Sequence, residues 1–244
     1  MSANPVAAWI VPLKGHLFDL EDLPHHLEGS PVSVINRGEG WYLRIPSEVV
    51  GHDFEPVLPA AREYLALLNG ICAVQLEDVR PLELASGEFY GLDVYGQVVH
   101  TIVQVKTPGV RYKPGHAGQH SGAHRNRPKG TFAPLLQEAR ATPSKAYALA
   151  IVGRSTLNWC DLYLVFALVE AGVGKRMYTE HWIARLDAAL FLRTVRTFTA
   201  LGGNGSSRKV VAEPPATLMN LTTALDLMRR LVARWVVDTA RPAA

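Results

Sequence analysis

The sequence predicts an α+β protein in which a strand-rich, mixed N-terminal domain precedes an all-α helical bundle. Short runs of β-branched and aromatic residues, broken by Gly, Asp and Asn, continue to about residue 105, whereas helical periodicity prevails after residue 131. The net charge changes sign between these two parts. The predicted organisation is therefore a domain at 1–106, a Gly/His/Arg-rich linker at 107–130 and a basic helical bundle at 131–240.

The composition is that of an ordinary globular protein. The chain has 244 residues, of which 48% are apolar, which is enough for a buried core in one large or two small domains. The N-terminus lacks the basic start and apolar run of a signal peptide, and no apolar stretch reaches the roughly 18 residues of a membrane span. We therefore expect a cytoplasmic protein without membrane association. Cys72 and Cys160 lack disulfide or zinc spacing, which predicts two reduced core cysteines.

The formal net charge of +3 conceals a marked asymmetry. Residues 1–105 hold 5 Lys/Arg and 14 Asp/Glu, a net charge of −9, whereas residues 106–244 hold 20 and 8, a net charge of +12. A cationic second half raises the local concentration of anions and favours partners that carry phosphate. The alternative is that the two halves complement each other across a contact between domains.

The first domain begins with strand-like segments. Residues 8–20 are predicted to be extended, with Pro12 at an edge position or bulge, and residues 21–27 to form a turn or short helix. Residues 32–35 and 41–45 form a predicted hairpin, because the glycines between them supply the positive φ angles of a tight connection.

One helix and further strands complete the predicted first domain. The helix covers residues 59–69, and Asn69-Gly70 is expected to end it as a left-handed cap. The strand-like runs that follow are broken at Asp, Ser-Gly and Tyr-Gly, and they cover residues 71–76, 79–84, 89–94 and 98–105.

The predicted linker is poor in core-forming residues and rich in Gly, Pro, His and Arg. Three interpretations of this segment stay open: a mobile linker, a basic arm that contacts nucleic acid, and a transition-metal site at His116, His120 and His124. The glycines between these histidines disfavour the helix that would align them. The candidate phosphate contacts in the arm are Arg111, Lys113, Arg125, Arg127 and Lys129.

Five helices are predicted after the linker, at residues 131–140, 142–152, 157–172, 178–201 and 220–237. The third is apolar nearly all round, which predicts the most buried position in a bundle of antiparallel helices. In the fourth, the residues expected to face the core are Ile183, Leu186, Leu190, Val195 and Phe198, with the arginines on other faces. In the last, Leu221, Leu225, Met228, Val232 and Trp235 are expected inward and Arg229, Arg230 and Arg234 outward.

A basic, glycine-rich turn flanks the fourth predicted helix at each end, at residues 172–176 and 202–209. Backbone N–H groups of such turns and nearby cationic side chains favour phosphate. Lys175, Asn204, Arg208 and Lys209 are therefore candidate phosphate contacts.

Several short motifs in the second half carry a family resemblance. They are Asn158-Trp159-Cys160-Asp161-Leu162-Tyr163, the segment 198–209 and Pro214-Pro215-Ala-Thr-Leu-Met-Asn-Leu before the last helix. With the strand-rich first domain, they resemble uncharacterised bacterial proteins that are similar to HEPN helical bundles. The resemblance covers residues 155–237. It implies a compact helical bundle that binds or acts on RNA, often in toxins or anti-phage defence, with an Arg and a His four to six residues apart in a dimer cleft.

Arg176 and His181 have the spacing that this resemblance requires. An arginine fork can hold a scissile phosphate and a histidine can move the 2′-hydroxyl proton, so the pair is a candidate for metal-independent cleavage of RNA. In the relatives, the turn that matches residues 202–210 tends to end in Arg-His, whereas it contains Arg208-Lys209 here. That departure weakens the argument for catalysis and leaves anion binding unchanged.

Other chemistries lack their motifs in this sequence. There is no dinucleotide or phosphate-loop fingerprint, no nucleophile elbow, no His-Glu-x-x-His and no cysteine pair with zinc spacing. The acidic cluster Asp19, Glu21 and Asp22 and the pair His25-His26 are more typical of a surface turn than of a metal site. No cofactor and no metal are expected.

Three functional hypotheses follow from the sequence. The helical domain recognises RNA or another phosphate-bearing ligand in a bacterial defence or toxin-like system, or it is a metal-independent endoribonuclease with Arg176 and His181 as catalytic residues. The alternative from a different class is a non-catalytic adaptor or structural subunit, acting as a homodimer or within a larger complex.

Overall fold

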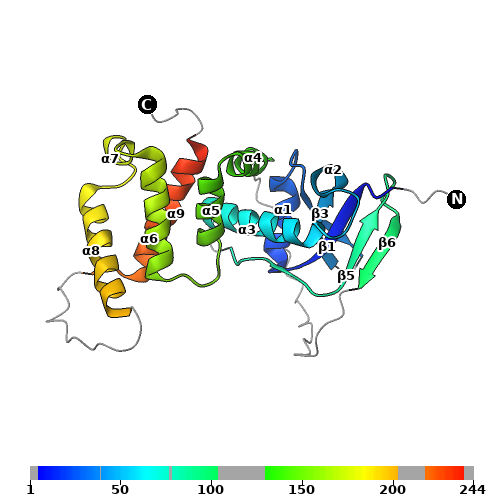
Figure 1. Cartoon of the computed structure of the whole chain (residues 1–244), viewed down its shortest axis with the longest axis horizontal. Coiled ribbons are helices and arrows are strands. Elements are labelled where there is room, and N and C mark those ends of the chain that lie inside the picture. The colour runs from blue at the N-terminus through cyan, green and yellow to red at the C-terminus, as the bar shows by residue number, and fades with distance from the viewer. Residues whose placement is uncertain (1–4, 39, 77–78, 104–129, 203–217, 239–244) are drawn as a thin grey trace. The chain divides into compact units, whose positions relative to one another are not determined.

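The computed structural model describes residues 5–38, 40–76, 79–103, 130–202 and 218–238 (Figure 1). Within these ranges the chain forms one antiparallel sheet of six strands and nine helices, most of them in the C-terminal half. This confirms a mixed α+β fold with a helical second half, whereas the HEPN-like identity of the helices stays a prediction. The chain divides into two compact units, residues 1–65 with 79–136 and residues 66–78 with 137–244. The predicted linker at 107–130 lies, except for its last residue, outside the described residues.

The sheet of the first unit has the strand order β2-β3-β1-β5-β6, and β4 also pairs with β1. All pairs are antiparallel, so β1 is central and β2 and β6 are edges. The predicted hairpin is confirmed as β2 and β3. The strands are β1 Ala8–Lys14, β2 Ser33–Arg37, β3 Gly40–Pro46, β4 Glu83–Leu84, β5 Glu88–Leu92 and β6 Val98–Val103.

The core of the first unit forms around Trp9 on β1. Its ring lies 5.4 Å from that of Phe54 and 6.3 Å from that of His100, and Phe54 in turn contacts Phe89 at 5.3 Å between centroids. Two helices flank the sheet: α1 (Leu17–His26) packs on β2, and α2 (Ser47–Val50) packs on β3. Helix α1 begins earlier than the predicted turn or helix at 21–27.

Two tyrosines on the other face of the sheet contact each other. Tyr42 and Tyr90 lie on the two strands that flank β1, with 6.1 Å between ring centroids in an edge-on arrangement. The Tyr90 hydroxyl donates a hydrogen bond of 2.6 Å to Oε2 of Glu88, which lies on the same face two residues earlier. This hydrogen bond to the carboxylate raises the pKa of Tyr90 to about 12.

Helix α3 (Val57–Gln75) is longer than predicted, and it joins the two units. Gly70 does not end the helix, and residues 71–75 are helical where a strand was predicted. The second part of α3, from residue 66, belongs to the helical unit. A short apolar run fits a buried helix as well as a strand, and tertiary packing decides between them.

The reason for a glycine at position 70 is a close helix crossing. A Cβ atom at Gly70 would overlap the backbone carbonyl of Leu149 on α5 (Pro143–Val152), and a Cβ atom at Gly153 would overlap the backbone of Gly70. The two backbones therefore approach so closely that only glycine fits on either side. The sequence signal that was interpreted as a helix cap marks a point of packing between two helices.

Three of the remaining helices form the centre of the second unit. Helix α5 packs on α6 (Trp159–Val173) and on α9 (Leu221–Val237), and α6 also packs on α9 and α8. Helix α6 begins with a capping box in which the Asn158 side chain accepts from the N–H of Asp161 while Asp161 accepts from that of Asn158. Helix α4 (Ala133–Ala141) precedes α5.

The segment predicted as one helix from 178 to 201 is two helices. Helix α7 (Arg176–Thr179) ends in a turn, and α8 begins at Arg185 and continues to Gly202. The backbone N–H groups of Trp182 and Ile183 both donate to the Met177 carbonyl, which closes the turn. The break changes the helix phase, so Ala188, Phe191 and Val195 are buried while Leu186 is 84% exposed.

Helix α9 confirms most of its predicted inward face. Met228, Val232 and Trp235 are buried, whereas Leu221 at the start of the helix is exposed. The Trp235 ring lies over Gly172 of α6, where a Cβ atom would overlap it. Cys72 is buried as predicted, but Cys160, in the first turn of α6, is exposed.

One helix among the described residues, α3, is long and apolar enough to cross a membrane by length and composition. Half of its apolar window is buried inside the protein, as in the core helix of a soluble protein. The cytoplasmic location stays a prediction.

The close helix crossing at Gly70 leads to a prediction about the stability of the fold. Gly70→Ala would stabilise an ordinary helix by about 1 kcal/mol through helix propensity. Here the added methyl group overlaps the Leu149 carbonyl, so we expect the free energy of unfolding to fall by about 1–3 kcal/mol. Chemical denaturation measures this change. Gly87→Ala is the control, because its Cβ atom would meet no neighbour closer than 3.8 Å. A Gly70→Ala protein as stable as the parent would contradict the crossing.

The Tyr90 hydroxyl makes a pH prediction. Its folded pKa of about 12 lies above the ordinary value of about 10, so the fold favours the neutral phenol. The contribution of this hydrogen bond to stability is complete below about pH 10 and is lost as the pH rises through 12. Absorbance titration of tyrosinate should show one late transition that Tyr90→Phe removes and Glu88→Ala moves toward 10. An unchanged titration in Glu88→Ala would refute the assignment.

Candidate functional site

Three of the predicted site residues lie in the described part of the chain: Lys175, Arg176 and His181. All three belong to α7 or to its flanking turns. The other candidate phosphate contacts fall outside the described residues, so their role stays a prediction. They are Asn204, Arg208, Lys209, Arg111, Lys113, Arg125, Arg127 and Lys129.

Arg176 is held by two carboxylates. Its Nε donates to Oε1 of Glu180 at 2.8 Å, and one Nη donates to Oε2 of the same residue at 3.2 Å. The same Nη lies 3.0 Å from Oδ2 of Asp238, the residue that follows α9. The guanidinium also lies 5.8 Å from the ring centroid of Trp182. The hydrogen bonds that Arg176 donates, mainly to Glu180 and then to Asp238, raise the pKa of Arg176 above its usual range.

Asp238 connects the end of α9 to α7 and to α5 through its side chain and its backbone carbonyl. Its carboxylate contacts Arg176 of α7, while its backbone carbonyl accepts a hydrogen bond of 3.4 Å from Nζ of Lys145 on α5. Lys145 is buried and forms a 2.7 Å ion pair with Glu138 on α4. The C-terminal end of α9 is thereby fixed by two cations from different parts of the unit.

His181 has an unusual backbone conformation for a residue other than glycine, with φ of 55°. Its carbonyl oxygen accepts a 2.8 Å hydrogen bond from Nη1 of Arg234 on α9, and its side chain is exposed. The carbonyl of His181 and the guanidinium of Arg176 therefore both connect the α7 turn to α9. Catalysis by Arg176 and His181 stays a prediction, and a phosphate would compete with two carboxylates for Nε and one Nη of Arg176.

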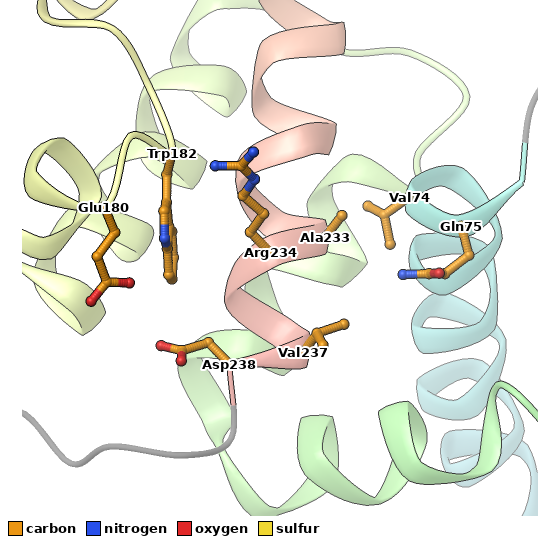
Figure 2. A pocket seen from close by; sticks show the side chains of 8 residues that line it. All are labelled: Val74, Gln75, Glu180, Trp182, Ala233, Arg234, Val237 and Asp238. Carbon is orange, nitrogen blue, oxygen red and sulfur yellow. The ribbon is translucent and has the colours of Figure 1, made fainter.

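A groove crosses the end of α9 next to this turn (Figure 2). It encloses about 610 Å³. Val74 and Gln75 at the end of α3 line one side, and Glu180 and Trp182 of the α7 turn line the other. All of these residues belong to the helical unit.

The floor of the groove comes from α9. It is formed by Ala233, Arg234, Val237 and Asp238, and the small side chain of Ala233 leaves the space. The groove thus combines apolar surface, one indole ring, one cation and two carboxylates that already hold Arg176. A mixed lining of this kind suits an uncharged, partly aromatic ligand better than a phosphate group.

A second hollow lies on α8 and has a different character. It encloses about 590 Å³, and its described lining consists of Ala189, Leu192, Arg193, Arg196 and Thr197. Arg193 and Arg196 are three residues apart and hence neighbours on the helix surface. The described lining contains two arginines and no carboxylate.

No group of three or more His, Cys, Asp or Glu side chains within the described ranges is arranged to hold a metal ion. The three histidines at 116, 120 and 124 lie outside those ranges.

Comparison with protein-family models, curated proteins and solved structures finds no match to this chain. The function therefore has to be argued from the chain's own residues, and the resemblance to HEPN bundles stays a prediction.

Sequence reasoning missed the residues that line the groove. Gln75 lies in a segment predicted as a strand, and Arg234 lies on the predicted outward face of the last helix. No local pattern connects them, because α3, the α7 turn and α9 are far apart in the chain. The α8 arginines carried a usable signal, since two arginines at i and i+3 beside Ala189 predict a cationic surface on that helix.

The ion pairs of Arg176 make a stability prediction. Arg176→Ala removes the charge that connects Glu180 to Asp238, so we expect a lower melting temperature. Arg185→Ala, an exposed arginine at the start of α8, is the matched control and should melt as the parent does. Calorimetry measures both. Equal melting temperatures for the two variants would show that the carboxylates do not depend on Arg176.

Proposed function

We propose that this protein binds RNA through its helical unit, with the hollow on α8 as the main phosphate contact. The observation that carries the proposal is the pairing of Arg193 and Arg196 in a concave surface whose described lining contains no carboxylate. The RNA partner and the bacterial defence or toxin-like setting come from the motifs that resemble HEPN bundles.

Two arginines one helical turn apart are well suited to a nucleic-acid backbone. Each guanidinium is planar, stays charged and can donate two parallel hydrogen bonds to one phosphate. Neutralising phosphates releases condensed counterions, which supplies affinity without any base contact. The basic residues predicted at 111–129 and 208–209 would add to the same electrostatic attraction.

Binding is a better-supported function than cleavage. A catalytic Arg176 needs donors that point at a scissile phosphate, but its Nε and one of its Nη atoms donate to Glu180 and Asp238. The enzyme hypothesis, a metal-independent endoribonuclease with Arg176 and His181, predicts cleavage in EDTA that an Arg176→Ala/His181→Ala variant lacks. The binding proposal predicts intact RNA with both proteins.

A second candidate function is that of a non-catalytic adaptor, as a homodimer or in a larger complex. Large apolar side chains that are strongly exposed favour it: Leu186 on α8 is 84% exposed and Tyr95 in the β5–β6 turn is 80% exposed. Light scattering separates this candidate from the first. A chain that is monomeric at high concentration and co-purifies with no protein would count against the adaptor.

If the protein binds RNA through α8, its affinity for RNA should fall steeply as salt rises, and the steepness should depend on Arg193 and Arg196. Arg193→Gln/Arg196→Gln should weaken binding of single-stranded RNA by about tenfold or more at low salt. The slope of log K against log salt should become shallower by about 0.7 for each phosphate that the variant no longer neutralises. Fluorescence anisotropy over a salt series measures both quantities.

The matched control is Arg230→Gln, an exposed arginine on α9 outside both hollows. It removes charge without touching α8, so its slope should stay close to that of the parent. Affinity that does not change between low and physiological salt in the parent would refute RNA binding. Equal reductions in affinity for the control and the α8 variant would remove α8 as the contact.

A further inference from the structure

We propose that the groove over α9 holds one unpaired base of the bound RNA strand, stacked against Trp182. This inference rests on the proposed function, because it assigns a base contact to a protein whose phosphate contacts lie on α8. The inference gives a role to the groove over α9, which the phosphate contacts on α8 do not involve.

The groove has the size and apolar character that a base requires. Its volume of about 610 Å³ lies within the usual range for small-ligand pockets. Ala233 provides a low floor, and Val74 and Val237 provide apolar surface beside it. Val237 is exposed, so its burial by a ligand would be favourable.

Trp182 forms one wall of the groove, and the α7 turn holds its backbone. Its backbone N–H donates to the Met177 carbonyl at 3.0 Å, and the Arg176 guanidinium lies 5.8 Å from its ring centroid. Figure 2 shows the indole edge-on between Glu180 and Arg234, so that one face is directed toward α9. An exposed aromatic face of this kind is a surface on which a base can stack.

Polar groups at both ends of the groove match a base better than a phosphate. The Gln75 amide offers a donor and an acceptor side by side, which is the pattern that pairs with the edge of a base. Arg234 uses one N–H for the His181 carbonyl, and its fork has further donors for a ring nitrogen or a ribose oxygen. The carboxylates of Glu180 and Asp238 already accept hydrogen bonds from Arg176, and they offer a phosphate group no hydrogen-bond donor.

The test compares a short single-stranded RNA with the same strand made abasic at its central positions. The parent should bind the base-bearing strand about tenfold more tightly, which is the usual effect of one stacked base. Trp182→Ala should bring this ratio close to one, and Gln75→Ala should lower it part of the way, while both keep the salt slope of the parent. Gln75→Ala is the informative variant if Trp182→Ala unfolds.

Arg193→Gln/Arg196→Gln separates the two proposals. It should weaken binding of both strands and keep the tenfold ratio. If the parent binds both strands equally, or if the variants in the groove keep the ratio, the base site is refuted while RNA binding stands. If the parent binds neither strand, both proposals fail together.

Discussion

The close crossing of α3 and α5 at Gly70 and Gly153 is the constraint on which the helical unit depends. A Cβ atom on either glycine would overlap backbone of the other helix, so the pair admits no larger side chain without a shift of a helix. Helix α5 in turn packs on α6 and α9. The crossing therefore fixes the end of α3 in the same unit as α9, which is what brings Gln75 to one side of the groove.

A network of ion pairs fixes the other side. Asp238 accepts from Arg176 through its carboxylate and from Lys145 through its carbonyl, so the end of α9 is held by α7 and α5. Lys145 is buried, and a buried cation without a partner would be costly, which explains its short contact with Glu138. These cations neutralise carboxylates within the unit.

In the proposed function, the two hollows would contact different parts of a nucleotide. The α8 surface has charge and a hydroxyl but no aromatic ring in its described lining, whereas the α9 groove has an aromatic ring and an amide beside neutralised charge. Phosphate contacts supply affinity without reading sequence, and base contacts supply preference. Residues 1–105 carry a net charge of −9, so this part of the chain does not favour a phosphate-bearing partner.

The sequence by itself determined the fold class, the hairpin of β2 and β3 and most of the helices after residue 131, because alternation, glycine turns and caps such as Asn158 act over a few residues. Tertiary structure decided the rest. Gly70 was interpreted as a cap and is a crossing, since the neighbour that requires glycine is 79 positions away at Leu149. The helix predicted at 178–201 is interrupted by a turn at His181, after which the backbone N–H groups of Trp182 and Ile183 both donate to the Met177 carbonyl. The ion pair of Arg176 with Asp238 joins residues 62 positions apart, and local patterns carry no information about contacts that only packing creates.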